Sequence, residues 1–195
     1  MVQIFWCLIY YGRSVYLDTT NIKLESERLV LRGFSKADLA DFNEYASVPG
    51  VGEMAGWAYH KSIEESQKIL DMFLAKKSNF ALFHKADGKV IGSLELQNAG
   101  WILKHPDFIG KSSLELGYVL AKPYWGQGLA VEAAKTAINY AFQNGTEVIA
   151  CNHFPENAQS RRVIEKLGFV YSHTGQFNSP MGKVFDELRY VLAKT

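Results

Sequence analysis

Segment 125–130, with the sequence Trp-Gly-Gln-Gly-Leu-Ala, is the stretch of this chain best suited to bind a ligand. It follows an apolar run at 114–120 with the pattern of a strand, and it opens an alanine-rich run of helical periodicity that ends at Phe142. Glycines at such a junction let the backbone turn tightly and approach a ligand. The first amides of a helix have no intrahelical partner and lie at the positive end of its dipole. The segment therefore predicts a binding site for phosphate oxygens.

Two common phosphate-binding loops do not fit this segment. A Walker A loop ends in Gly-Lys-Ser/Thr, which is absent here, and the Gly110-Lys111-Ser112 triplet fails because His105 occupies the position of that loop's first glycine. A dinucleotide-binding fingerprint fits only incompletely, because Val131 replaces its third small residue. No acidic residue follows the strand at 147–151 to bind a ribose, and the alternating β-α units of that fold are missing. We reject both.

The elements that must position the segment alternate in an order that predicts the fold class. Helices are expected after two capping-box serines, Ser35 and Ser62, then over 129–142, and after Asn157 as an N-cap. Strands are predicted at 28–32, 79–84, 90–96, 113–120, 147–151, 169–174 and 184–192. One β-α-β crossover stands among antiparallel hairpins, so we predict an α+β domain with a mixed, mostly antiparallel sheet.

The composition indicates a globular domain that needs no disulfide or metal to fold. The chain has 195 residues, of which 48% are hydrophobic, and this is enough for a packed core. A net charge of +1 gives no reason to expect nucleic acid as a partner. Cys7 and Cys151 have neither metal nor disulfide spacing, which fits a reducing compartment. The five histidines are scattered, so no metal site is expected.

The N-terminal segment is unusual, because residues 2–11 are almost continuously apolar. Ten residues are too few to span a bilayer, which takes about 20. The segment also lacks the basic start and the cleavage site of a signal peptide. We predict an apolar N-terminal extension over residues 1–21 and a single domain over residues 22–195, with no membrane association.

Residues from about 23 to 194 resemble the GNAT superfamily of acyl-CoA-dependent N-acyltransferases, and most closely the branch that holds ribosomal-protein N-terminal acetyltransferases and many small-amine acetyltransferases. The motifs that carry the resemblance are Arg28-Leu29-Val30-Leu31-Arg32, Gly92, Glu115-Leu116-Gly117-Tyr118, Pro123 to Ala130 with Glu132-Ala133, Asn157-x-x-Ser160 and Glu165-Lys166-Leu167-Gly168-Phe169. Each motif is weak alone, but together they run in the family's order over most of the chain. The family's pyrophosphate loop usually begins with Gln or Arg, where this chain has Trp125.

This resemblance implies a GNAT fold, with about 7 strands flanked by about 4 helices and a splay between the fourth and fifth strands, 113–120 and 147–151. It implies acetyl-CoA (coenzyme A) as co-substrate and no metal, with the pantetheine arm in the gap and the pyrophosphate at the helix tip. The cofactor-binding residues that it implies are Tyr118, Val119, Leu120, Trp125, Gly126, Gln127, Gly128, Leu129, Ala130, Asn157, Ser160 and Arg161. Three basic residues are candidates to contact the 3′-phosphate end of the cofactor, and the alternative for each is a solvated side chain: Arg161, Arg162 and Lys135.

The transfer needs a neutral amine, and because amine pKa values lie near ~8 to ~10.4, a general base helps. We predict Glu115 as the base, since it projects from the strand face opposite Leu114 and Leu116, and Glu95 as the second choice. Ser160 is predicted to protonate the departing thiolate, and a backbone amide near Val119 to hold the oxyanion. Each of these side chains also has a purely structural reading as a solvated carboxylate or serine.

The sequence therefore predicts a cytoplasmic, acetyl-CoA-dependent N-acetyltransferase that transfers an acetyl group to a primary amine by direct attack in a ternary complex. Two acceptor classes stay open, a protein N-terminus and a small-molecule amine. The alternative is a non-catalytic, regulatory acyl-CoA-binding module of the same fold. No nucleic acid or membrane partner is expected, and the protein is predicted to be a monomer or a homodimer.

Overall fold

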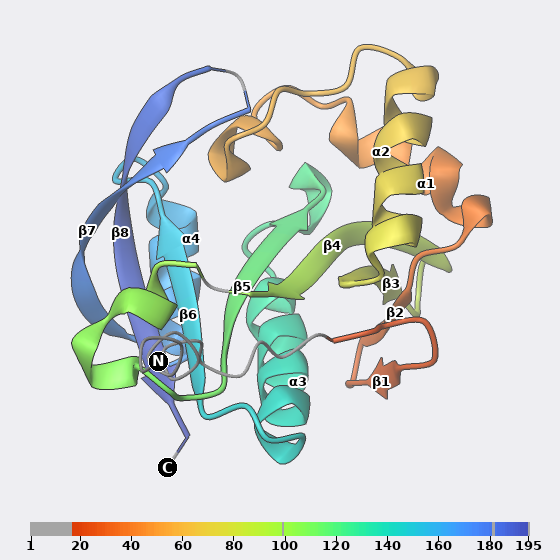
Figure 1. Cartoon of the computed structure of the whole chain (residues 1–195). Coiled ribbons are helices and arrows are strands. Elements are labelled where there is room, and N and C mark those ends of the chain that lie inside the picture. The colour runs from red at the N-terminus through yellow and green to blue at the C-terminus, as the bar shows by residue number, and fades with distance from the viewer. Residues whose placement is uncertain (1–16, 99, 181, 195) are drawn as a thin grey trace, which may run out of the picture.

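A computed structural model describes residues 17–98, 100–180 and 182–194. Most of the predicted N-terminal extension, residues 1–16, lies outside the described residues. The described residues form an eight-stranded sheet with the order β1-β2-β3-β4-β5-β6-β8-β7 (Figure 1). Its strands are β1 Lys23–Glu25, β2 Leu29–Gly33, β3 Asn79–His84, β4 Lys89–Gln97, β5 Ser113–Leu120, β6 Val148–His153, β7 Val170–Asn178 and β8 Val184–Ala193.

The sheet is mixed and mostly antiparallel, as predicted, because among the described residues β5 and β6 form its single parallel pair. The strand beyond the predicted seven is β1, which pairs with β2. Three residues are too few to show the alternation that marks a strand in a sequence.

The two faces of the sheet are covered by different helices (Figure 1). Helices α1 (Leu39–Ala46) and α2 (Ile63–Lys76) pack on one face, whereas α3 (Leu129–Gln143) and α4 (Ala158–Lys166) pack on the other. The predicted capping contacts form, since Ser62 Oγ accepts from the Glu65 amide at 3.3 Å and Asp38 accepts from the Ser35 amide at 2.7 Å.

Side-chain alternation along the strands divides the core between these faces. In β3, Phe80 and Leu82 join the cluster under α3 and α4, whereas Ala81 joins the cluster under α1 and α2. Helix α3 contributes small, fully buried residues such as Ala133 and Ala137, and their size lets its backbone lie close to the sheet.

Strands β5 and β6 separate partway along their length. They pair from Ser113 opposite Val148 to Leu116 opposite Cys151 and no further, although β5 continues to Leu120 and β6 to His153. The predicted splay is therefore present, between the fifth and sixth strands once β1 is counted.

Candidate active site

A cavity of about 640 Å³ opens at the gap between β5 and β6. Most of its lining comes from these two strands, from β4 and β8, from helices α3 and α4 with the loop before α3, and from Val51, Met54, Ala55, Trp57 and Phe177. The sequence-predicted site residues that line it are Glu115, Tyr118, Val119, Leu120, Trp125, Gly126, Gly128, Leu129, Ala130, Asn157 and Ser160. Gln127 and Arg161 do not line it.

The tip of α3 presents free backbone donors to this cavity. Gly126 and Gly128 have φ of 76° and 79°, in the left-handed region that favours glycine, and Gly128 is the N-cap of the helix. The backbone amides of 126–131 donate no hydrogen bond to any residue that the structure describes. A Cβ built on Gly126 meets nothing within 4 Å, so the tip is open. Free amides at a helix N-terminus fit phosphate oxygens.

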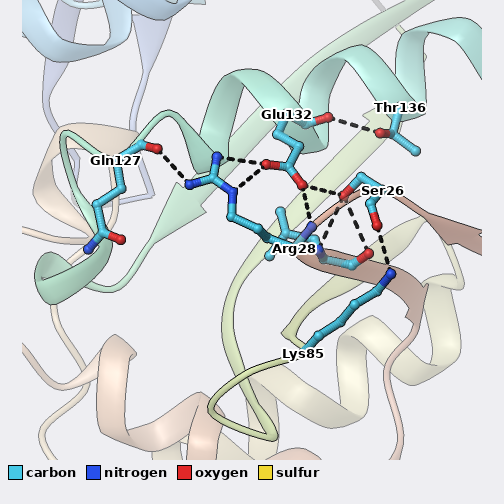
Figure 2. A network of polar contacts seen from close by, with 7 residues as sticks. Ser26, Arg28, Lys85, Gln127, Glu132 and Thr136 are labelled. Atoms are coloured by element: carbon cyan, nitrogen blue, oxygen red, sulfur yellow. Dashed lines mark hydrogen bonds and ion pairs between the residues drawn. The ribbon is translucent and has the colours of Figure 1, made fainter.

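A polar network fixes the shape of this tip (Figure 2). In the Arg28 guanidinium, Nη1 donates to the Gln127 carbonyl at 3.0 Å and Nε donates to Glu132 Oε2 at 2.8 Å. The other carboxylate oxygen, Oε1, accepts from the Arg28 amide and from Ser26 Oγ, each at 2.7 Å. The chain just before β2 therefore holds both the helix and the loop in front of it.

Glu132 is expected to stabilise the fold through this network. Burial by itself would raise the pKa of Glu132, but hydrogen bonds from the Arg28 amide, Ser26 and the Arg28 guanidinium together hold it below its ordinary value. A carboxylate with a lowered folded-state pKa stabilises the protein above its unfolded pKa, and this contribution is lost as the pH falls through the folded pKa.

We therefore expect Glu132→Gln to lower the free energy of unfolding at pH 7 by about 1–3 kcal/mol. The deficit should shrink as the pH falls below the ordinary Glu pKa of about 4.3, because there the unfolded chain takes up protons that the folded carboxylate resists. Denaturant unfolding of both proteins at pH 7 and about pH 3.5 measures this. A deficit of the same size at both pH values would show that the charge of Glu132 does not matter.

The backbone of β5 directs two amides into the gap. The Ala121 amide donates to the Ile91 carbonyl of β4 at 2.8 Å, whereas the Leu120 carbonyl points the other way and accepts from the Trp125 indole at 2.7 Å. Peptide groups alternate sides along a strand, so the amides of Tyr118 and Leu120 face the gap and that of Val119 faces β4. A Cβ on Gly92 would lie 2.2 Å from the Val119 carbonyl oxygen, which agrees with this orientation. The amides near Val119 that face the gap, those of Tyr118 and Leu120, are therefore the candidates for the predicted oxyanion donor.

Two hydroxyl groups meet across the gap, one from each side. Tyr118 Oη lies 2.8 Å from Ser160 Oγ, and it donates to the Ser160 carbonyl at 3.3 Å. Burial raises the pKa of Tyr118 far above its ordinary value. The phenol therefore stays protonated, and the pair can supply a proton inside the cavity.

Asn157 caps α4 as predicted, because its Oδ1 accepts from the Ser160 amide at 3.0 Å. Its Nδ2 donates to the Met54 carbonyl at 3.1 Å. The cap therefore ties α4 to residues 51–57, and both of its polar atoms already have a protein partner.

Glu115 belongs to a network that the sequence did not reveal. The Asn152 Nδ2 group of β6 donates to Glu115 Oε1 at 3.3 Å and to Glu187 Oε2 of β8 at 2.8 Å. The other oxygen of Glu187 accepts from Arg189 Nε at 2.6 Å. One amide therefore bridges two carboxylates, of which Glu187 also has a cationic partner.

The surroundings of Glu115 make it a weak acid. Burial, followed by the negative charge of Glu187, raises the pKa of Glu115 to about 7, although Arg189 and the donor groups of Trp101 and Asn152 oppose the rise. A carboxylate with this pKa in a cavity can accept a proton near neutral pH. Glu115 therefore has the protonation chemistry expected of a general base.

Glu95, the second candidate base, also lines the cavity but is held by other residues. Its Oε1 accepts from Ser78 Oγ at 2.6 Å and forms an ion pair with Lys76 Nζ at 2.6 Å. This pairing leaves Glu95 less suited than Glu115 to accept a proton from a ligand.

The three basic candidates for the 3′-phosphate end occupy different positions. Arg161 forms an ion pair with Glu165 at 2.8 Å, whereas its neighbour Arg162 lines the cavity together with Lys166. Lys135 lines a separate surface hollow. The role predicted for Arg161 thus stays a prediction, and Arg162 has the better position for it.

His153 is a satisfied structural residue. Its Nδ1 lies 2.8 Å from the Phe154 carbonyl oxygen, and its Nε2 lies 3.2 Å from Tyr190 Oη. Both ring nitrogens are therefore engaged.

Within residues 17–98, 100–180 and 182–194, no cluster of three or more His, Cys, Asp or Glu side chains has an arrangement that could hold a metal ion. None of the helices in the same ranges combines the length and the apolar character needed to cross a bilayer.

The residues that sequence reasoning missed are Asn152, Glu187 and Arg189, together with Met54 and Trp57 of the segment before α2. Side chains alternate between the two faces of a strand, so the predicted strand at 184–192 already placed Glu187 and Arg189 on one face. This alternation was a usable signal that the two residues lie together. Nothing in the sequence placed that face opposite Glu115, because the pairing of β6 with β8 is a long-range contact.

Comparisons with known proteins relate this chain to a family of enzymes. Residues 28–170 match the family model described as an acetyltransferase (GNAT) domain. The uncharacterized N-acetyltransferase p20 of Bacillus licheniformis is 28% identical over 178 residues, which cover 88% of this chain and 96% of that protein.

Solved structures show the same fold. A GNAT-family acetyltransferase from Bacillus anthracis superposes with a TM-score of 0.74 at 24% identity, over 88% of this chain and 98% of the other. A ribosomal-protein-S5-alanine acetyltransferase from Vibrio fischeri gives a TM-score of 0.67 at 20% identity, over 89% and 97% of the two chains.

Proposed function

Because this chain belongs to the GNAT family of acetyltransferases, whose members use acetyl-CoA, we propose that it acetylates a primary amine by direct attack in a ternary complex. The acceptor is a protein N-terminus or a small-molecule amine. The observation that carries the proposal is the cavity at the β5–β6 gap, which is lined both by the helix tip with its free amides and by Glu115. Residues 22–195 act as one domain, and the enzyme works in the cytoplasm.

The residues that line the gap fit the chemical groups of acetyl-CoA. This co-substrate supplies an acetyl group activated as a thioester. The amides of 126–131 would hold its pyrophosphate, and Arg162 and Lys166, or the predicted Arg161, would neutralise the 3′-phosphate. The Tyr118 and Leu120 amides are placed to donate to carbonyl oxygens in the gap.

Glu115 and the hydroxyl pair divide the proton transfers between them. Glu115 accepts the proton that the amine must lose, directly or through water. On the other side of the gap, Ser160, aligned by Tyr118, donates a proton to the thiolate that leaves. The two groups reach the reacting centre from opposite faces of β5, since residues 115 and 118 project to opposite sides of the strand.

We expect Ser160→Ala and Tyr118→Phe each to lower kcat by about 10- to 100-fold, because each removes one member of the donor pair. The double variant should be no slower than the slower single variant, since the two hydroxyls act as a unit. Single-turnover kinetics with acetyl-CoA measure the chemical step. Unchanged turnover in Ser160→Ala would remove this residue from the mechanism.

Calorimetry with acetyl-CoA, followed by thiol release across a panel of amines, tests the proposal. Binding together with turnover of at least one amine supports it. Binding without turnover of any amine or free-N-terminus peptide would favour the non-catalytic acyl-CoA-binding module, and absence of binding would refute both.

A further inference from the structure

Three buried or half-buried carboxylates lie on one face of the sheet at the cavity. Gln97 is directly opposite Glu115, and Glu95 is directly opposite Gly117, so these side chains share a face. Asn152 joins Glu115 to Glu187 on the same face. Glu95, Glu115 and Glu187 all line the cavity, and we name this set the acidic floor.

The charges of the acidic floor are unevenly neutralised. Glu95 pairs with Lys76 at 2.6 Å, and Glu187, whose side chain is only 4% exposed, pairs with Arg189 at 2.6 Å. Among the described residues Glu115 forms no ion pair, and the Asn152 amide that donates to it is neutral. A buried carboxylate without a cationic partner is costly to ionise, so a ligand cation placed there would be stabilised.

An apolar wall stands beside the acidic floor, formed by Met54, Trp57, Phe154 and Phe177. The Phe154 ring lies 4.9 Å from that of Phe185 and 5.9 Å from that of Phe177. Phe177 is directly opposite Phe185 in the sheet, and Phe185 is two residues from Glu187. These rings therefore project from the same face as the acidic floor.

The apolar wall is held in place before any ligand binds. Gly56 has a φ of 84°, and a Cβ there would lie 2.5 Å from the Phe177 ring, so the close packing needs glycine. The Gly56 carbonyl accepts from Ser179 Oγ at 2.6 Å, and the Met54 carbonyl accepts from Asn157. A preformed apolar wall selects ligands by shape and hydrophobicity.

From this juxtaposition we propose the acceptor class, and this rests on the proposed function. The acceptor is a primary amine that carries an apolar group close to the nitrogen and no carboxylate beside it. Its ammonium binds at Glu115, its apolar group packs on the apolar wall, and Glu115 then takes the proton. A free amino acid is disfavoured because its carboxylate would lie against the acidic floor, where Lys76 and Arg189 are already paired.

The test compares kcat/KM for four amines by thiol release at saturating acetyl-CoA. L-Phenylalaninamide and L-phenylalanine differ by one carboxylate charge, and 2-phenylethylamine and ethylamine differ by one ring. Rates are compared per concentration of neutral amine, because the carboxylate also raises the pKa of the neighbouring amine. We expect phenylalaninamide to exceed phenylalanine by at least about 100-fold, because like charges placed together cost several kcal/mol. We expect phenylethylamine to exceed ethylamine by about 10- to 100-fold.

Two matched variants test whether the apolar wall causes the preference for phenylethylamine over ethylamine. Phe177→Ala should reduce the ratio of phenylethylamine to ethylamine at least about 5-fold, since the wall loses a ring. Tyr171→Ala, on the same strand but exposed and outside the cavity lining, should leave the ratio unchanged.

Equal rates for phenylalanine and its amide, or for phenylethylamine and ethylamine, would overturn the acceptor class while leaving the acetyltransferase proposal standing. If acetyl-CoA binds but no amine or peptide is turned over, the proposed function fails, and the acceptor class fails with it.

Discussion

Replacing Glu115 by Gln should lower kcat/KM by about 10²–10⁴-fold, because it removes the carboxylate proposed to take the proton from the amine. The substitution keeps the size of the side chain and an oxygen that can still accept from Asn152. Affinity for acetyl-CoA should change little, since Glu115 projects from the sheet face opposite to the one that α3 covers. Steady-state kinetics with an amine substrate, combined with calorimetry, separate the two effects.

The pH dependence of the wild type gives the same residue a second test. Because the pKa of Glu115 is raised to about 7, kcat/KM should fall as the pH drops through this value, as the carboxylate becomes protonated.

A raised pKa of the Glu115 carboxyl also means that its ionisation destabilises the fold. Stability should decline as the pH rises from the ordinary Glu value toward about 7. Glu115→Gln should therefore be more stable than the wild type at about pH 8, by about 1–3 kcal/mol.

Glu95→Gln is the matched control, since Glu95 lines the same cavity and has its own cationic partner. We expect the kcat/KM of Glu95→Gln to stay within about 10-fold of the wild-type value, because Glu95 does not transfer the proton in the proposed mechanism. If Glu95→Gln were the slower of the two variants, the base would be Glu95.

The second large effect concerns the helix tip. Gly126→Asp should weaken acetyl-CoA binding by at least about 100-fold, because two unit charges about 4 Å apart repel by about 4 kcal/mol near a protein surface. Gly126 has a φ of 76°, a conformation that Asp and Asn tolerate better than other residues, and its Cβ position is open. Calorimetry with acetyl-CoA measures the change in Kd.

Gly126→Asn isolates the charge, because it has nearly the same shape and the same backbone cost as Gly126→Asp. We expect it to bind acetyl-CoA at least about 10-fold more tightly than Gly126→Asp does. Equal affinities of the two variants would show that the helix tip does not meet a phosphate.

Much of this protein follows from the sequence alone. The glycines of 125–130 and the alanine periodicity behind them predict a phosphate-binding helix tip, because backbone conformation and helix phase are local properties. Alternation in 113–120 places Glu115 opposite Leu114 and Leu116 for the same reason. The family motifs extend these local patterns to the splayed sheet, and the structure confirms that sheet.

What the sequence could not determine is which distant side chains meet. Asn152, Glu187 and Arg189 come from β6 and β8, and their relation to Glu115 depends on strand order and register. The apolar wall depends in the same way on residues 51–57 reaching Phe154 and Phe177.

Local chemistry thus predicted a phosphate-binding helix tip and a candidate general base, Glu115, and only the tertiary structure decided the surroundings of this carboxylate. The physical reason is that burial and the charge of a neighbour set the pKa of Glu115, and both arise from contacts between segments far apart in the sequence.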